Sequence, residues 1–279
     1  RSPNMQIFKT IWTGERLSPR RRLLYSMWRP PTDGRTFGVQ TVDVTSLLEC
    51  IKKRNDASSG PKITITHALS KGIGTIALDE KYDLNGHFFM GRFLRHRTKD
   101  VGVLVTARDG KDLGAVKISS IDRKTLKEIS AEVKAYAEAF RRQEENTDHK
   151  KASNVLSSLP FFMIRAVVDV VGFLNNRLGI PTKGYPSQEF PMGRLIISSL
   201  MTYGVDIAFP PLVASMHMPA AVVISAVHSK VVVFEGKPAV RKVVNLCWTF
   251  DHRFSDGVDL AKIAIEVRNL FENPEALFL

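Results

Sequence analysis

The residues best suited to proton transfer lie near the end of the chain, in the run Asp251-His252-Arg253-Phe254-Ser255-Asp256-Gly257. A histidine has an ordinary pKa of about 6.5, so its ring accepts a proton near neutral pH. A carboxylate close to that ring can orient it or organise the loop around it. His252 and Asp256 are four residues apart. This spacing suits a catalytic pair and a purely structural hydrogen bond alike, so both interpretations stay open.

Two regular elements are predicted to hold this run in place. Residues 243–250 alternate between two faces, as a β-strand does. Apolar residues then recur at helical spacing from Val258 to Phe271. Asp256 occupies the N-cap position of that helix, and Asn273-Pro274 are residues that end one. His252 is therefore expected at the end of a strand, with Asp256 across a tight turn from it.

The rest of the chain also alternates between strand and helix patterns. Strands are predicted at 37–44, within 87–105, at 113–118 and at 193–199, followed by a hairpin of 221–234 and 240–250 across Glu235-Gly236-Lys237-Pro238. Helices are predicted to start at Ser18, to span 45–54 and 66–80, and to follow Ser120 as a cap. The sequence has no G-x-G-x-x-G or Walker motif. This pattern predicts an α+β protein that is neither a Rossmann nor a P-loop domain.

Composition and charge narrow the class of protein. The 279 residues are 44% hydrophobic, enough for one large domain or two modest ones. Forty Lys and Arg stand against 28 Asp and Glu, which favours anionic partners such as phosphorylated cofactors, acidic proteins or an anionic membrane. No recognised nucleic-acid motif accompanies the charge, so we expect no nucleic acid. Cys50 and Cys247 are the two cysteines, which predicts neither disulfides nor a metal site and suits a reducing intracellular compartment.

An apolar stretch at 159–178 follows a charged linker at 144–151. Arg165, Asp169 and Arg177 interrupt the stretch, so no transmembrane span is predicted. Three roles remain open for it: packing in the core or against another subunit, lining an acyl pocket, or peripheral contact with a membrane surface.

The whole motif Asp-His-Arg-x-x-Asp-Gly after a strand resembles the active-site signature of the 2-oxo acid dehydrogenase acyltransferases. Their catalytic domain shares its fold with chloramphenicol acetyltransferase. The resemblance extends over nearly the whole chain, through the segments 17–22, 37–47, 101–103 and 195–200. It implies an α+β, chloramphenicol acetyltransferase-like mixed β-sheet flanked by helices, assembled as a homotrimer or a higher assembly with active sites between subunits. It further implies an N-terminal extension at 1–15 and a catalytic domain at 16–279, with an insertion at about 146–190.

The resemblance also implies a reaction, acyl transfer between thiols with coenzyme A as a substrate. His252 would be the general base that removes the proton of a thiol on coenzyme A or dihydrolipoamide. Ser198, at the family's serine position, would donate a hydrogen bond to the oxyanion, with Ser199 as a second candidate.

Three further residues would support that site. Asp256 would organise it through the turn and through an ion pair, for which Arg21 is the expected partner. Arg253 would do similar structural work, and Gly257 completes the signature. No metal is implied.

Several departures from the family favour an alternative function. Residues 108–114 replace a short channel segment, and Met201 stands where the family has glycine. No lipoyl or subunit-binding domain is recognised before Arg16, so a lipoyl group would come from another chain. The alternative is a catalytically inactive scaffold or assembly subunit of a larger multienzyme complex. A mitochondrial matrix or a bacterial cytoplasm would suit either function.

Overall fold

The computed structural model describes residues 15–16, 34–106, 113–141, 161–178, 180, 192–213 and 216–278. The strands are β1 Glu15–Arg16, β2 Arg35–Asp43, β3 Gly86–Phe89, β4 Arg92–Arg95, β5 Val101–Thr106, β6 Leu113–Ile118, β7 Leu195–Ser199, β8 Ala220–Ile224, β9 His228–Phe234 and β10 Lys237–Asp251. The helices are α3 Thr45–Asp56, α4 Ile65–Ala77, α5 Leu126–Arg141, α7 Phe161–Arg177 and α8 Gly257–Glu272, with short 3₁₀ turns η1 Met201–Tyr203 and η3 Pro274–Phe278.

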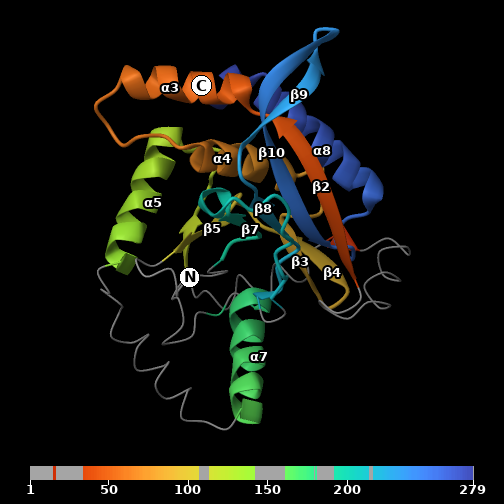
Figure 1. Cartoon of the computed structure of the whole chain (residues 1–279). Coiled ribbons are helices and arrows are strands. Elements are labelled where there is room, and N and C mark those ends of the chain that lie inside the picture. The colour runs from red at the N-terminus through yellow and green to blue at the C-terminus, as the bar shows by residue number, and fades with distance from the viewer. Residues whose placement is uncertain are drawn as a thin grey trace.

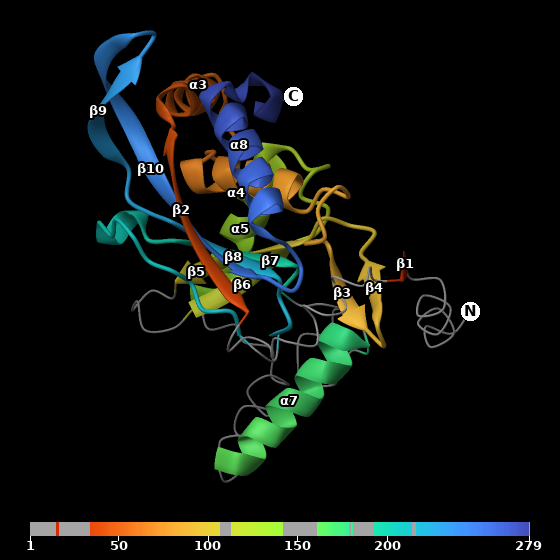
Figure 2. The ribbon, with the colours of Figure 1, turned by 90° about the vertical axis from the view of Figure 1, so that its right-hand side faces the viewer.

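A mixed sheet organises the molecule. Its strands run in the order β2-β10-β8-β7-β5-β6, and β9 pairs with the first part of β10. β7 is parallel to both β5 and β8, whereas the other pairs of this sheet are antiparallel. Helices α3, α4, α5 and α8 lie on one face of the sheet (Figures 1 and 2). β1, β4 and β3 form a second, small sheet beside it. The expected α+β class, a mixed sheet flanked by helices, is confirmed.

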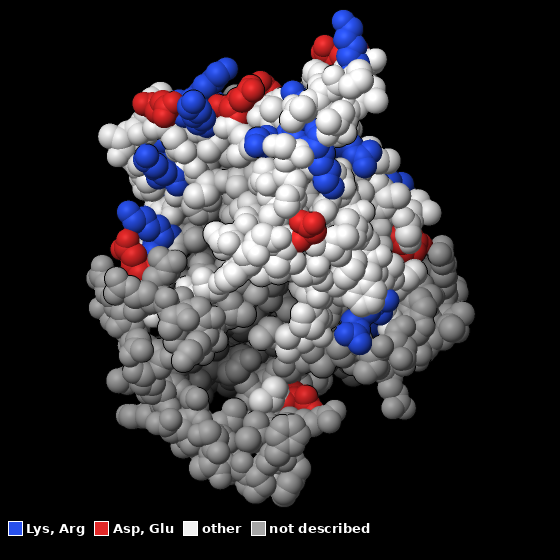
Figure 3. Space-filling view, in the orientation of Figure 1, with Lys and Arg blue, Asp and Glu red and all other residues white. Residues whose placement is uncertain are grey.

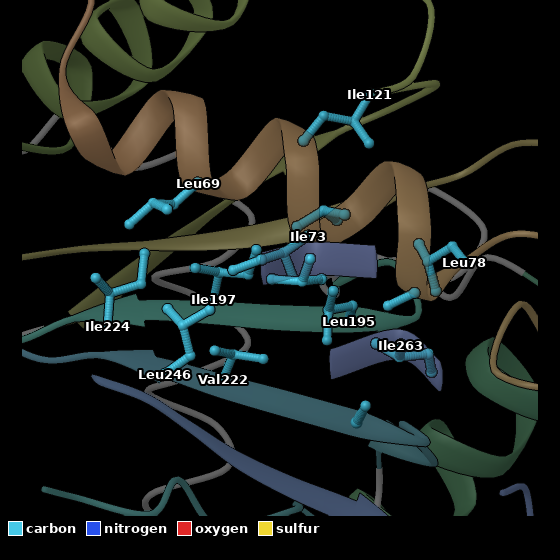
Figure 4. Packing of buried hydrophobic residues seen from close by; sticks show 14 of the residues in the cluster. Leu69, Ile73, Leu78, Ile121, Leu195, Ile197, Val222, Ile224, Leu246 and Ile263 are labelled. Carbon is cyan, nitrogen blue, oxygen red and sulfur yellow. The ribbon is translucent and has the colours of Figure 1, made fainter. Parts of the chain in front are cut away.

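The main core lies between this sheet and α4 (Figure 4). Thr64 and His67 form a capping box at the start of α4, in which the Thr64 amide donates to His67 Nδ1 at 3.2 Å. Burial lowers the pKa of His67 to about 4, so the ring stays neutral and keeps that acceptor. A Cβ at Gly74 would lie 2.6 Å from Val101, and one at Gly72 would lie 2.6 Å from Phe271. The glycines that weaken the helix pattern are therefore what let α4 approach its neighbours.

The other face of the sheet is covered differently. A small buried cluster lies there, made of Ile196, Leu212, Met218 and Ala221. Five apolar side chains of β2 and of the segment at 205–213 are exposed. We call them the apolar patch: Phe37, Val39, Ile207, Phe209 and Val213. The rings of Phe37 and Phe209 meet edge to face with centroids 5.2 Å apart, which joins β2 to the segment at 205–213. An exposed group of this kind is typical of a surface that another protein covers.

Helix α7 projects away from the body of the molecule (Figure 2). The Phe173 ring lies 6.3 Å from that of Phe89 in β3, and Asn175 is buried. Met163 and Val170 are exposed, however, which contradicts packing of that face in the core of one chain. Contact with another subunit, the lining of an acyl pocket and contact with a membrane surface all stay predictions. No helix in the described ranges is long and apolar enough to span a membrane.

The structure corrects two details of the sequence reading. Ser120 does not cap a helix, since its φ is +50°. α5 begins at Leu126, and its cap is formed by Thr125, just before the helix, and Glu128, in its first turn, which exchange hydrogen bonds. The predicted strand at 221–234 is two strands, β8 and β9. The predicted helix from Ser18 and most of the altered segment at 108–114 lie outside the described residues.

Candidate active site

His252 follows the last residue of β10, as predicted. Its backbone amide donates to the Gly34 carbonyl at 2.6 Å, which ties the turn to the start of β2. The Phe254 amide donates to the Asp251 carbonyl at 3.0 Å and closes the turn. The His252 side chain is partly exposed. A partly exposed imidazole on a hydrogen-bonded turn can meet a substrate from solvent while its backbone stays fixed.

A buried ion pair holds the turn from inside. Arg253 Nε lies 2.9 and 3.0 Å from the two carboxylate oxygens of Asp251, and both side chains are about 5% exposed. The Arg253 amide also donates to Asp251 Oδ1 at 3.1 Å. The Asp251 amide donates to the Pro219 carbonyl at 2.8 Å, so β8 supports the same residue. These contacts leave the two residues on either side of His252 little freedom to move.

Asp256 caps α8, as the sequence predicts. Its Oδ1 accepts from the amides of Val258 at 3.1 Å and Asp259 at 3.4 Å. Gly257 is the first residue of α8, and a Cβ there would meet nothing within 4 Å. Gly257 is therefore not required by lack of space. The predicted partner Arg21 lies outside the described residues, so that ion pair stays a prediction.

Ser198 and Ser199 end β7, but the structure does not bring them to His252. Ser198 is in register with Val223 of β8, and Val223 is in register with Cys247 of β10. His252 lies five residues beyond Cys247. The two side chains are thus separated by roughly 16 Å along the strands and by two strand spacings across them. They lie at opposite ends of the sheet within one chain.

Ser198 lies on the face of the sheet that the helices leave open. Ile197 belongs to the main core under α4, whereas Ile196 belongs to the small cluster on the opposite face. Because side chains alternate along a strand, Ser198 shares the face of Ile196, and Ser199 shares that of Ile197. That open face also bears the Phe37 and Phe209 side chains of the apolar patch. Ser198 is therefore better placed than Ser199 to meet a second molecule.

Sequence reasoning missed a buried group of basic residues behind the turn. Arg194 is fully buried, donates from Nη2 to the His217 carbonyl at 2.9 Å and lies 5.9 Å from the Phe254 ring. His96 Nε2 and His87 Nδ1 are 3.0 Å apart. Burial, with the nearby charge of Arg194, holds the pKa of His96 well below its ordinary value, so its ring is neutral. The signal in the sequence was a charged residue, Arg194, directly before the apolar strand β7.

No group of three or more His, Cys, Asp or Glu side chains in the described part of the chain could hold a metal ion.

Solved structures share this fold. The dihydrolipoamide acetyltransferase of Azotobacter vinelandii superposes with a TM-score of 0.65 at 20% identity, covering 92% of this chain and 88% of that one. A probable dihydrolipoamide acetyltransferase of Listeria monocytogenes gives 0.63 at 18% identity, covering 91% and 88%. The cubic core of a pyruvate dehydrogenase multienzyme complex gives 0.63 at 19% identity, covering 100% and 93%. The architecture is thus that of dihydrolipoamide acyltransferase catalytic cores.

The sequence itself defines the family. The model for the 2-oxoacid dehydrogenases acyltransferase catalytic domain matches residues 30–165 and 183–279. The chain belongs to this family of acyltransferases. A lipoamide acyltransferase component of the branched-chain alpha-keto acid dehydrogenase complex from Pseudomonas aeruginosa is 36% identical over 93 residues, and that from Pseudomonas putida is 34% identical over 92. The match spans 33% of this chain and 21% of each of these relatives.

Proposed function

We propose that this chain transfers an acyl group between two thiols, with coenzyme A as one of them and His252 as the general base. The observation that supports this most is the geometry of the signature turn. His252 is fixed at the end of β10 by the Gly34 carbonyl, and Asp251 and Arg253 form a buried ion pair on either side of it. Such support is what a proton-transferring side chain needs to hold its position during a reaction.

The reaction starts with removal of a proton from the attacking thiol by the His252 imidazole. A thiol has an ordinary pKa of about 8.5, so little thiolate is present at neutral pH without a base. The thiolate forms a bond to the thioester carbonyl carbon, and the carbonyl oxygen becomes an oxyanion. When this intermediate collapses, the bond from carbon to the other sulfur breaks. The departing thiolate takes the proton from the imidazolium, so charge and atoms balance.

Ser198 is the proposed hydrogen-bond donor to the oxyanion, supplied by a neighbouring subunit. Within one chain it lies roughly 16 Å along the strands from the level of His252, too far to reach the same carbonyl. A ring of subunits, each placing its His252 against the open face of the next, would complete one site at every contact. The exposed apolar patch on that face supports such a contact. A homotrimer is the assembly that we propose.

A lipoyl group enters this proposal only as a substrate arm on another chain. Dihydrolipoamide offers the same thiol chemistry as coenzyme A, so His252 would serve both. The chain's 40 Lys and Arg against 28 Asp and Glu suit the phosphates of coenzyme A, and membership of a multienzyme complex is part of the same proposal.

Subunit mixing tests the proposed site. His252→Ala should lower acyl transfer from acetyl-coenzyme A to dihydrolipoamide by roughly 10²- to 10⁴-fold, and Ser198→Ala by roughly 10²- to 10³-fold. In a random equal mixture of the two variants, a quarter of the subunit contacts pair an intact His252 with an intact Ser198. Co-refolding should therefore restore about one quarter of the wild-type activity.

The control is a mixture of the wild type with the double variant His252→Ala/Ser198→Ala. This mixture should also retain about one quarter of the wild-type activity if sites form between subunits, but about one half if each chain carries its own site. Wild-type rates in His252→Ala alone would contradict the proposal and favour the inactive scaffold. Met201 does not by itself favour the scaffold, because its side chain packs against the main core, on the other face of the sheet from Ser198.

A further inference from the structure

The hairpin of β9 and the start of β10 extends beyond the strands that flank it (Figures 1 and 2). β2 pairs with β10 from Val243 onward, whereas β9 pairs with β10 from Lys237 to Val243. Glu235 and Gly236 form the two-residue turn, with φ values of +49° and +78°, as a type I′ turn requires. In the described part of the chain, β9 pairs with β10 alone. The outer edge of β9 is therefore an open strand edge.

The register shows which backbone groups face that edge. In a hairpin with a two-residue turn, the closing pair exchanges two hydrogen bonds, and the bonded pairs alternate along the ladder with pairs that are not bonded. Phe234 and Lys237 are the closing pair. Val233–Pro238 and Val231–Val240 are then non-bonded pairs, which agrees with the missing N–H of proline. The amides and carbonyls of Val231 and Val233 consequently point outward, where another strand could pair with them.

The two faces of the hairpin have different chemistry. Val231, Val233 and Val240 share one face and are 71%, 78% and 70% exposed. Lys230 and Arg241 face each other on the opposite side, where the Arg241 guanidinium lies 4.1 Å from the Phe234 ring centre. In total the hairpin has four basic side chains and one carboxylate: Lys230, Lys237, Arg241 and Lys242 against Glu235. Arg241 is paired with Asp43 of β2 at 2.6 Å, so the three lysines carry the remaining excess of positive charge. Basic groups gather at its base in Figure 3, and one also lies at its tip.

We propose that β9 is a docking edge for an extended segment of another protein in which acidic and apolar residues alternate. Such a segment adds a strand to the sheet through Val231 and Val233. Its apolar side chains lie beside the valines, and its carboxylates lie beside Lys230 on the other face. A second copy of the hairpin would bring the same excess of basic side chains, and this repulsion between like charges disfavours self-association through β9. The proposal does not depend on acyl transfer.

A labelled peptide tests the proposal on the full chain. The probe is a seven-residue peptide of alternating Val and Glu, and its binding is followed by fluorescence polarisation. Two comparison peptides are a block-ordered peptide of the same composition and a peptide of alternating Val and Lys. The alternating acidic peptide should bind at least about tenfold more tightly than either. Hydrogen exchange with the peptide present should slow at the amides of Val231 and Val233.

Variants locate the contact. Lys230→Glu should weaken binding of the acidic peptide about tenfold and strengthen that of the basic one, because the cross-strand charge is reversed. Val231→Pro removes an outward-facing amide that makes no hydrogen bond within the hairpin. It should abolish binding of the acidic peptide. The matched control is Lys262→Glu, at an exposed position of α8, which should leave the binding of both peptides unchanged.

Three results would overturn the proposal. The first is equal binding of the alternating and the block-ordered acidic peptides. The second is unchanged binding of the alternating acidic peptide to Lys230→Glu. The third is an altered oligomeric mass in Val231→Pro, which would make a second copy the occupant. The circular dichroism spectrum of Val231→Pro must match the wild type; if that variant unfolds, Lys230→Glu and the exchange measurement decide.

Discussion

A single buried ion pair sets the shape of the turn around His252. Asp251 and Arg253 are two residues apart and bond through both carboxylate oxygens. Neither side chain has much contact with water, so each charge depends on the other for compensation. In the proposed reaction, the position of His252 thus depends on two residues that do not themselves transfer a proton. Arg194 is fully buried and, like Arg253, lies 5.9 Å from the centre of the Phe254 ring, so a second basic group stands beside the same turn.

Asp251→Asn should lower the free energy of unfolding by roughly 3–5 kcal/mol, because it leaves the Arg253 charge buried without its partner. Urea unfolding measures the change. The control is Lys81→Gln, which breaks the exposed ion pair with Glu266, leaves the hydrogen bond between Tyr82 and Glu266 in place, and should cost less than about 1 kcal/mol. If both substitutions cost the same, the buried pair does not have the structural role assigned to it.

At the scale of elements, β10 and α8 position the site from its two sides. β10 lies between β2 and β8 over its last residues, so its end is held by two ladders. α8 packs on the core through Ile263, Val267 and Phe271. Asp256 connects the two because it both ends the turn and caps the helix. A capping role and a role for its charge can be separated by substitution.

Asp256→Ala should destabilise the protein by about 1 kcal/mol, since the amides of Val258 and Asp259 lose their acceptor. Asp256→Asn keeps an acceptor, so its stability should stay within about 0.5 kcal/mol of the wild type. We expect kcat in Asp256→Asn to fall about tenfold, because the ion pair that we predict with Arg21 would be lost. Wild-type kcat in Asp256→Asn would confine this residue to capping.

At the scale of the whole molecule, the sheet has one face covered by helices and one that those helices leave open (Figures 1 and 2). Ser198 lies on the second face, and the apolar patch lies on the same side. His252 lies at the far end of the sheet from Ser198. In the proposed function, a catalytic site that needs both residues forms only where two subunits meet, so a monomer would lack it.

Phe209→Lys should dissociate the assembly at micromolar concentrations and abolish acyl transfer with it, because a charge replaces an apolar side chain in the patch. Light scattering after size exclusion measures the mass. The control is Ile265→Lys, which changes an apolar residue of α8 that is more exposed than Phe209 (56% against 41%) and should leave both mass and activity intact. An unchanged mass in Phe209→Lys would place the subunit contact elsewhere.

The sequence by itself determined the elements around the site. β10, the turn and α8 follow from alternation, an Asp cap and helical spacing within about thirty residues, and these signals act through local backbone preferences. Local preferences do not explain the two glycines of α4, because these glycines make room for Val101 and Phe271, which belong to other elements. The motif at 251–257 likewise names the family without reference to tertiary structure.

Only the tertiary structure decided where these elements lie relative to one another. The separation of Ser198 from His252 depends on the register of β7, β8 and β10, and a register arises from pairing between distant segments. The burial of Arg194 and the projection of α7 are decided in the same way. An apolar helix has the same sequence pattern whether a core or a partner covers it, because periodicity records which face is apolar but not what it meets.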